Sequence, residues 1–163
     1  MRRIKNLLLV GLVVLTALFS SCSKDYYDTK TAGEDFLQQN AKREVVTVLP
    51  SGIQYEIIFD NPAGSYPQFA EASEITIKAI YSVRFINDSV YTESPYVQVI
   101  ELSDRPDNFW LEVIPKMRVG AKWRCWVPYD YAYGEEGQDV SKTGYDIDPY
   151  TVLVYDIELT HAQ

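Results

Sequence analysis

The sequence predicts an α+β domain in which several antiparallel strands pack around one short helix. Apolar and polar side chains alternate between Ile75 and Phe85, which is the period of a half-buried strand. A similar alternation runs through residues 153–159. Asn87-Asp88 has the composition of a two-residue hairpin turn with left-handed backbone angles, which joins antiparallel neighbours. Only one convincing helix follows this turn, near residues 108–115.

The first 21 residues have the three parts of an export signal: basic residues, an apolar stretch from Leu7 to Phe19, and two serines before Cys22. The apolar stretch is too short to be a comfortable membrane span. The arrangement resembles a bacterial lipoprotein signal, in which the peptide is cut before the cysteine and the cysteine is acylated. An ordinary secretory signal with an incidental cysteine is the alternative. We expect a lipid anchor on Cys22.

The segment after Cys22 bears on location. Ser23-Lys24-Asp25 does not resemble an inner-membrane retention signal, which favours an outer-membrane lipoprotein facing the periplasm or the cell exterior. Cleavage of residues 1–21 would remove three of the 15 basic residues and none of the 23 acidic ones, so the net charge would change from −8 to −11. That acidity argues against nucleic acid and anionic membrane surfaces as partners.

The composition supports one domain without an internal disulfide. The hydrophobic content of 47% is sufficient for the core of a domain of this length. Acylation of Cys22 would leave Cys125 as the only thiol, so no pair of cysteines remains to form a bond.

Residues 22–30 are polar and charged without periodicity, and we interpret them as a tether. Thr31 and Glu34 have the spacing of a capping box, which predicts a helix from there to about Arg43. We assign residues 31–48 to a helical extension that serves as a spacer or a docking segment. A homodimer through this helix is an alternative that no residue pattern supports.

Short apolar runs predict further strands. A turn at residues 50–52 leads into a strand from Ile53 to Phe59, which ends at the Pro- and Gly-containing segment 61–64. After the hairpin turn the chain returns through residues 89–94, and another apolar run occupies residues 97–102.

The helix near the middle of the chain has start and stop signals. Asp107 or Asn108 can cap it, and Pro115 ends it because proline has no amide proton to donate. Its apolar stripe consists of Trp110, Val113, Ile114 and Met117. A strand at 121–128 and a long polar loop at 129–150 then precede the last strand.

Five segments in this order resemble FKBP-type peptidyl-prolyl cis-trans isomerases. They are LPSGIQYEII at 49–58, IYSVRFINDSVYTES at 80–94, FWLEVIPKMRVGAKW at 109–123, WVPYDYAYGEEG at 126–137 and DPYTVLVYDIEL at 148–159. The match covers roughly residues 36–159, and we assign residues 49–163 to the FKBP-like domain. The resemblance implies a curved antiparallel sheet wrapped around the short helix, with a shallow apolar pocket between them that accepts a proline ring.

The resemblance also implies which side chains form that pocket. Trp110 would be its floor, and the hydroxyl of Tyr133 would donate a hydrogen bond to the substrate carbonyl. The walls and the overhanging loop would be formed by Tyr81, Tyr91, Tyr155 and Ile147. Taken singly, each aromatic residue is more simply explained by packing, so the prediction depends on their joint placement.

A pocket of this kind suits rotation about an X-Pro bond. The planar amide is stabilised by resonance, so rotation must cross a barrier of about 20 kcal/mol. A twisted amide has less charge separation, and transfer from water into an apolar cavity therefore favours the transition state. We expect no cofactor and no metal, because His161 is the only histidine, expected in a solvated tail, and no cluster has the spacing of metal ligands or of a hydrolytic triad.

The chain departs from the family's pattern at the pocket rim. Thr92 occupies the position of an aspartate, and Glu93 can replace that carboxylate only if a bulge turns it to the same face. Pro106-Asp107 stands where an aliphatic pair is usual, and the overhanging loop is more acidic than usual. We retain Thr92 with Tyr133 as candidate catalytic residues.

Two functions follow as hypotheses. The first is a lipid-anchored prolyl isomerase that acts on proline-containing peptide or protein clients in the cell envelope. The second is a non-catalytic FKBP-like module that binds a peptide or a protein. A third, carbohydrate binding by exposed aromatic residues, depends only on the presence of 13 tyrosines.

Overall fold

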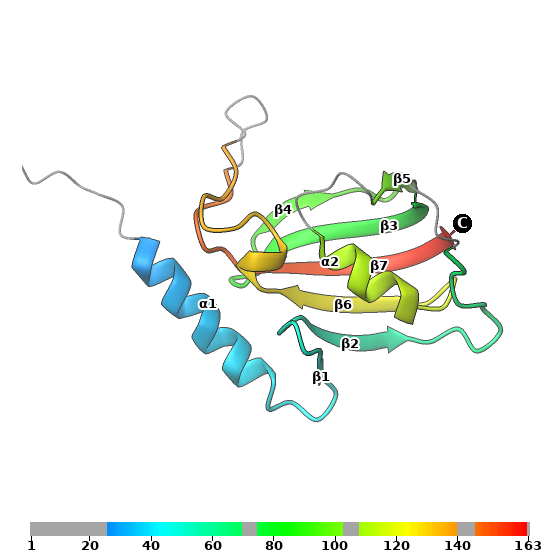
Figure 1. Cartoon of the computed structure of the whole chain (residues 1–163), viewed down its shortest axis with the longest axis horizontal. Coiled ribbons are helices and arrows are strands. Elements are labelled where there is room, and N and C mark those ends of the chain that lie inside the picture. The colour runs from blue at the N-terminus through cyan, green and yellow to red at the C-terminus, as the bar shows by residue number, and fades with distance from the viewer. Residues whose placement is uncertain (1–25, 70–74, 103–107, 140–145, 163) are drawn as a thin grey trace, which may run out of the picture.

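The computed structural model describes residues 26–69, 75–102, 108–139 and 146–162. They form one antiparallel sheet, a long N-terminal helix and a short helix packed against one face of the sheet (Figure 1). The elements are α1 (Tyr26–Asn40), β1 (Thr47–Val48), β2 (Gln54–Phe59), β3 (Thr76–Phe85), β4 (Val90–Glu93), β5 (Gln98–Glu101), α2 (Phe109–Val113), the 3-10 turns η1 (Ile114–Lys116) and η2 (Tyr129–Tyr131), β6 (Lys122–Val127) and β7 (Leu153–Ala162). The predicted α+β class, with its curved antiparallel sheet, is confirmed.

The strand order is β1-β2-β6-β7-β3-β4, and β5 pairs with β3 beside β4. The last strand in the sequence therefore lies in the middle of the sheet, between β6 and β3. The helix α2 crosses the concave face over β6 and β7 (Figure 1). This arrangement brings side chains from β3, β7 and α2 together in one core.

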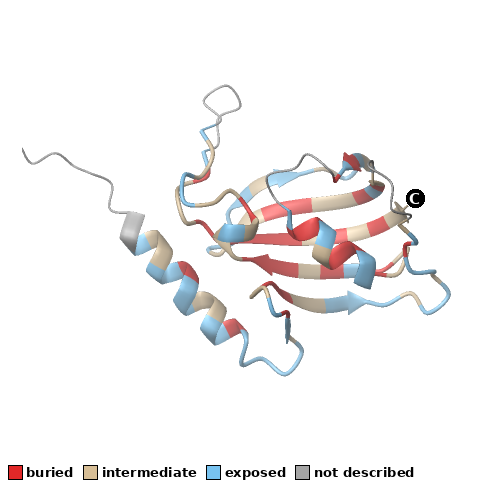
Figure 2. Ribbon diagram, viewed as in Figure 1, coloured by how far each residue is buried: buried red, intermediate tan, exposed pale blue. Residues whose placement is uncertain are grey.

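The core lies between α2 and the sheet, where buried residues recur along the strands (Figure 2). In β3 the predicted alternation is confirmed, since Ile77, Ala79 and Val83 are buried and Lys78 is exposed. Ser82 is also buried, although it belongs to the opposite face, where it is paired with Asp156 of β7. The largest fully buried side chains include Trp110, Tyr155, Phe109, Ile53, Ile77, Ile114 and Met117.

The prediction for α1 is wrong at both ends. The helix begins at Tyr26, inside the segment interpreted as a tether, and ends at Asn40 rather than near Arg43. Thr31 and Glu34 lie within the helix, so they cannot form a capping box, which requires a non-helical residue before the first turn. Beyond Asn40 the chain continues in tight turns, in which the amide of Arg43 donates to the carbonyl of Asn40.

The prediction for α2 is confirmed at its end. The α-helix stops at Val113 and continues as a 3-10 turn that contains Pro115, whose missing amide proton prevents the α-helical hydrogen bond. Asn108 precedes the helix, but its side chain makes no capping hydrogen bond. Asp107, the other predicted cap, lies outside the described residues, as does Pro106.

The hairpin between β3 and β4 is in its predicted place but has a different turn. The amide of Phe85 donates to the carbonyl of Ser89, so the loop has three residues, and of these only Asp88 has a positive φ, of 64°. Asn87 instead accepts a hydrogen bond from the Ser89 amide through its side chain at 3.0 Å.

The prediction that His161 lies in a solvated tail is wrong, because His161 is half-buried and pairs with Lys78 in the sheet.

Within the described ranges, no helix has the length and apolar character needed to cross a bilayer.

Candidate functional site

Three of the predicted pocket residues meet on the concave face. The ring of Trp110, from α2, packs edge-on against Tyr81 of β3 at 5.4 Å and against Tyr155 of β7 at 5.8 Å between ring centroids. These T-shaped contacts place the positive edge of one ring against the negative face of another, which stabilises them beyond burial alone. The sheet order explains this contact, since β3 is the neighbour of β7 and α2 lies over β7 and β6.

A fourth aromatic residue belongs to the same cluster and was not predicted as a site residue. Phe109 packs on Trp110 at 4.7 Å and on Tyr155 at 4.4 Å, and it is fully buried. Its position directly before Trp110 was visible in the sequence, but adjacent helical residues usually point in different directions. Only the tertiary contact with Tyr155 identifies it.

A β-bulge in β4 decides which side chains reach the rim. Val83 pairs with Thr92, whereas the next residue, Arg84, pairs with Val90, so Tyr91 is the extra residue. Paired residues share a face of the sheet. Thr92 therefore lies on the concave face with Val83, beside Tyr91 rather than opposite to it.

The same register places Glu93 on the outer face, so it does not replace the missing rim carboxylate. Glu93 pairs with Ser82 and lines a groove of about 350 Å³ together with Arg124 and Asp156. The bulge that could have turned Glu93 inward lies one residue too early and turns Thr92 inward instead.

Tyr91 joins β4 to the loop that follows η2. Its ring packs edge-on against Phe85 at 6.0 Å, and its hydroxyl donates a long hydrogen bond of 3.4 Å to Oε1 of Gln138. Burial raises the pKa of Tyr91 above its ordinary value, and the nearby Tyr81 and Asp146 raise it further. Tyr91 is therefore neutral and half-buried, and it stays a predicted wall residue.

Tyr133 and Ile147 lie in the segment between η2 and β7. A two-bond bridge closes this segment, because the amides of Gln138 and Ile147 each donate to the other's carbonyl, at 2.8 and 2.9 Å. Gly137 has a φ of +68° and touches the Ile147 carbonyl so closely that no Cβ fits there. The bridge holds Ile147 buried, at 2% exposure, while Tyr133 is half-buried against the core.

The exposure of the aromatic cluster is uneven. Trp110 and Tyr155 are each 1% exposed, whereas Tyr81, Tyr91 and Tyr133 are partly exposed. Of the predicted wall residues, Tyr81 and Tyr91 are therefore accessible, whereas Tyr155 is covered together with the predicted floor, Trp110. Residues 103–107, which precede α2, lie outside the described residues, and so do residues 140–145 of the overhanging loop.

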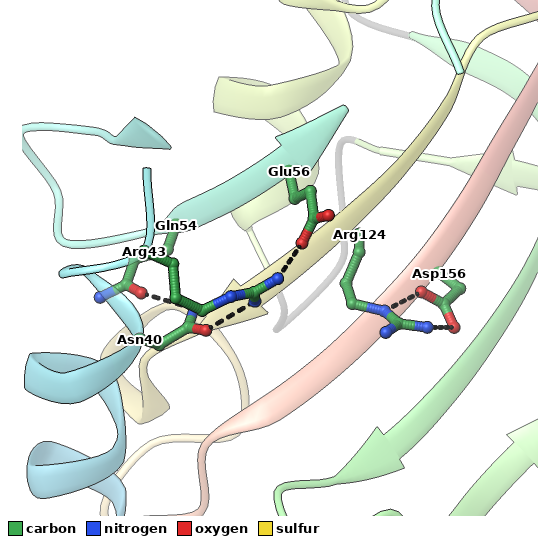
Figure 3. Close-up of polar contacts among 6 residues, drawn as sticks. All are labelled: Asn40, Arg43, Gln54, Glu56, Arg124 and Asp156. Carbon is green, nitrogen blue, oxygen red and sulfur yellow. Dashed lines mark hydrogen bonds and ion pairs between the residues drawn. The ribbon is translucent and has the colours of Figure 1, made fainter. Parts of the chain in front are cut away.

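The outer face of the sheet is polar and differs in kind from the concave face. Arg124 donates to both carboxylate oxygens of Asp156, at 2.6 and 2.9 Å (Figure 3). Arg84 lies 3.3 Å from the same carboxylate. The hydrogen bond to Asp156 raises the pKa of Arg124. Figure 3 also shows the side chains that connect α1 and the turn after it to β2, which are those of Asn40, Arg43, Gln54 and Glu56.

Metal-ligating and nucleophilic groups do not gather at this site. Across the part of the chain that the structure describes, no three His, Cys, Asp or Glu side chains are placed to hold a metal ion. Cys125 is fully buried, and burial raises the pKa of its thiol far above the ordinary value, so it is neutral.

Comparison with known proteins agrees with this geometry. A family model described as FKBP-type peptidyl-prolyl cis-trans isomerase matches residues 71–160, and another, described as the domain amino terminal to FKBP-type peptidyl-prolyl isomerase, matches residues 16–57. The solved structure of a peptidyl-prolyl cis-trans isomerase from Pseudomonas syringae pv. tomato superimposes with a TM-score of 0.71 and 27% identity, and the match covers 85% of this chain and 96% of that one.

Two curated relatives extend the comparison. The FKBP-type 22 kDa peptidyl-prolyl cis-trans isomerase of Escherichia coli K12 is 32% identical over 131 residues, which are 78% of this chain and 58% of the relative. The outer membrane protein MIP of Legionella longbeachae is 29% identical over 145 residues, which are 84% of this chain and 55% of the relative. The chain thus spans between half and two thirds of the length of these two relatives. It belongs to the family of FKBP-type peptidyl-prolyl cis-trans isomerases.

Proposed function

We propose that this protein is a prolyl cis-trans isomerase of the cell envelope that acts on X-Pro bonds in peptides or unfolded protein clients. The observation that carries the proposal is the contact of Tyr81 and Tyr155 with Trp110 on the concave face, with Tyr91 beside them. These are the positions at which the family resemblance expects the walls and the floor of a proline pocket.

The proposed mechanism needs no covalent step. The proline ring enters between the partly exposed walls, and the aromatic surface excludes water from the amide. Since a twisted amide has less charge separation than a planar one, the apolar environment stabilises it more than it stabilises the ground state. The Tyr133 hydroxyl would hold the substrate carbonyl, which contributes about 1 kcal/mol as a net hydrogen bond.

A protease-coupled assay with an X-Pro peptide tests the proposal. We expect the wild-type chain to accelerate isomerisation and Tyr133→Phe to lower the rate by several-fold, since about 1.4 kcal/mol corresponds to a factor of ten. Tyr131→Phe is the matched control, because Tyr131 is also partly buried against the core but is not a predicted site residue.

Thr92→Asp should raise the rate, because the bulge already turns residue 92 toward the rim. No acceleration by either the wild type or Thr92→Asp would refute the enzyme hypothesis.

A non-catalytic binding module is the second candidate, and the burial of the floor favours it. A ring that is 1% exposed, as in Trp110, contacts a ligand only if its cover moves. Acrylamide quenching of Trp110, in a chain where Trp123 and Trp126 are replaced by phenylalanine, measures that access. Quenching that a proline-containing peptide suppresses supports a pocket that opens, whereas binding of the peptide without any catalysis supports the second candidate.

We further propose that Cys22 carries a lipid and places the protein in the outer membrane. The support is the arrangement of residues 1–22 and the name of the Legionella relative, outer membrane protein MIP. Cys22→Ala should abolish labelling by a radioactive fatty acid and shift the chain to the soluble or unprocessed fraction. Cys125→Ala is the control, because the buried Cys125 thiol is not an acylation site. Wild-type protein that fractionates entirely as soluble and unlabelled would refute the anchor.

Pairing of two chains through α1 stays a prediction. The contacts of α1 described here are made with its own domain, as in the Asn40–Gln54 hydrogen bond of 2.9 Å. Sedimentation equilibrium of the chain without its signal segment distinguishes a monomer from a dimer.

A further inference from the structure

The side chain of Lys30, on α1, lies against two tyrosines that are far from it in the sequence. Its ammonium nitrogen is 5.4 Å from the ring centroid of Tyr129 and 5.1 Å from that of Tyr150. The two rings also pack edge-on against each other at 5.1 Å. A cation within about 6 Å of an aromatic ring is attracted by the negative charge of the ring face, so one ammonium group contacts both tyrosines.

These two tyrosines form the base of the segment that carries Tyr133 and Ile147. Two backbone hydrogen bonds join them through Gly134, whose amide donates to the Tyr129 carbonyl at 2.8 Å and whose carbonyl accepts from the Tyr150 amide at 3.2 Å. The bridge between Gln138 and Ile147 lies farther along the same segment. Tyr129 and Tyr150 are therefore joined through the residue that follows Tyr133, and Tyr150 lies three residues after Ile147.

Tyr150 has a backbone conformation that needs support from its surroundings. Its φ is +60°, in the left-handed region that a bulky residue rarely adopts, and such conformations persist where neighbouring structure holds them. Gly33 of α1 packs so closely here that an added Cβ would lie 2.7 Å from Cγ2 of Val152 and 3.8 Å from the Tyr150 carbonyl oxygen. The helix thus contacts the end of the segment through both Gly33 and Lys30.

The opposite end of α1 provides a contrast. The guanidinium of Arg43 lies 5.2 Å from the ring centroid of Trp126 and forms an ion pair of 2.6 Å with Glu56. Trp126 and Glu56 belong to β6 and β2, away from the segment that holds Tyr133 and Ile147. Two cations, Lys30 in α1 and Arg43 in the turn after it, therefore bind aromatic rings, and only Lys30 contacts the base of the candidate site.

We infer that Lys30 is a positioning residue for the isomerase site: by binding Tyr129 and Tyr150 together, it fixes the segment that presents Tyr133 and Ile147 to a substrate. This inference rests on the proposed function for its catalytic consequence, but the positioning itself is a property of the fold. The N-terminal helix then acts as a part of the site and not only as a spacer.

The first test measures the segment without using activity. In Lys30→Met the ammonium group is lost while an unbranched apolar side chain is kept, and Lys30→Arg restores a cation. We expect hydrogen exchange at the amides of Gln138, Ile147 and Tyr150 to become about two- to five-fold faster in Lys30→Met and to return toward the wild-type rate in Lys30→Arg. Arg43→Met, the matched control at the other end of the helix, should leave these amides unchanged.

The second test measures peptide kinetics of the full chain. Lys30→Met should raise KM for an X-Pro peptide by about two- to five-fold and change kcat less, because a loosened segment must be ordered when the peptide binds. Arg43→Met should leave both constants at the wild-type values, and Lys30→Arg should restore KM.

The outcomes separate the inference from the proposed function. Unchanged exchange in Lys30→Met, or equal acceleration in Lys30→Met and Arg43→Met, overturns the positioning role, and so does a failure of Lys30→Arg to restore the slow rate. An inactive wild-type chain refutes the proposed function alone, and the exchange experiment then still decides whether Lys30 holds the segment.

Discussion

The two helices of this protein attach to the same sheet by opposite kinds of contact. In α2, Phe109, Trp110 and Val113 are buried and meet other apolar side chains. In α1, Gly33 and Asn40 are the only buried residues among those whose side chains are described. Phe36 and Leu37 are only half-buried, and α1 with the turn after it is held by hydrogen bonds, an ion pair and cations packed on aromatic rings. Apolar burial makes α2 part of the core, whereas polar contacts make α1 an attachment that can be weakened one contact at a time.

The attachment of α1 is centred on Gln54, a buried residue of β2. Its Oε1 accepts from Nδ2 of Asn40 at 2.9 Å (Figure 3). Its Nε2 donates to the Leu37 carbonyl at 2.8 Å. Arg43 then donates to Oδ1 of Asn40 at 3.0 Å. Each polar group is satisfied by its neighbour, so removal of one member leaves others unpaired in a partly buried setting.

Removal of the largest side chain of α2 should have the largest effect. Trp110→Ala should lower the free energy of unfolding by about 3 to 5 kcal/mol, because a fully packed aromatic ring leaves a cavity lined by Tyr81 and Tyr155. Urea unfolding monitored by circular dichroism measures it. The control is Leu111→Ala, since Leu111 belongs to the same helix but is 44% exposed. Equal losses in the two variants would contradict the view that burial fixes α2.

Loss of the central polar residue should have an intermediate effect. Gln54→Leu should cost about 1 to 3 kcal/mol, because it leaves the Asn40 amide and the Leu37 carbonyl without their partner. The same urea experiment applies, and Gln39→Leu on the exposed side of α1 is the control. A neutral or stabilising result would show that α1 gains more from apolar contact than from this hydrogen-bonded group.

The side chain of Arg43, just after the end of α1, should contribute least to the free energy of unfolding. Arg43→Met should cost less than about 1 kcal/mol, since the side chain of Arg43 is 46% exposed and exposed ion pairs are screened by solvent. The ion-pair part of the difference from the wild type should shrink in 1 M NaCl, where the Debye length falls to about 3 Å. A cost that does not change with salt would assign the contact to packing of the guanidinium on Trp126.

The same contrast explains what the sequence could predict. Strands β2, β3, β6 and β7 and the end of α2 near Pro115 follow from apolar periodicity and from the missing proton of proline, which are local properties. The start of α1 at Tyr26 does not, because no apolar stripe marks it and its contacts are made with residues far along the chain. The prediction from the capping-box pattern failed because the pattern is informative only where the preceding residue is not helical.

The candidate site likewise has features that the sequence could predict and features that it could not. The resemblance to the family identified the positions of Tyr81, Trp110 and Tyr155, which the structure brings together. The side to which Thr92 and Glu93 turn depends on a bulge at Tyr91, and a bulge is a one-residue shift between two strands that neither strand shows alone. Lys30 could not be predicted at all, because its partners lie at both ends of a long loop.

The way α1 is docked sets how far an anchored domain can travel from a bilayer. The proposed lipid attachment at Cys22 lies four positions before Tyr26, and four residues of chain span at most about 14 Å. If Cys22 is acylated as proposed, α1 held against its domain would keep the sheet close to the lipid surface. The 15-residue helix is about 22 Å long, so its release would increase the distance between the anchor and the sheet by roughly that length. A few polar contacts would then decide whether a client is met at the membrane or out in the aqueous compartment.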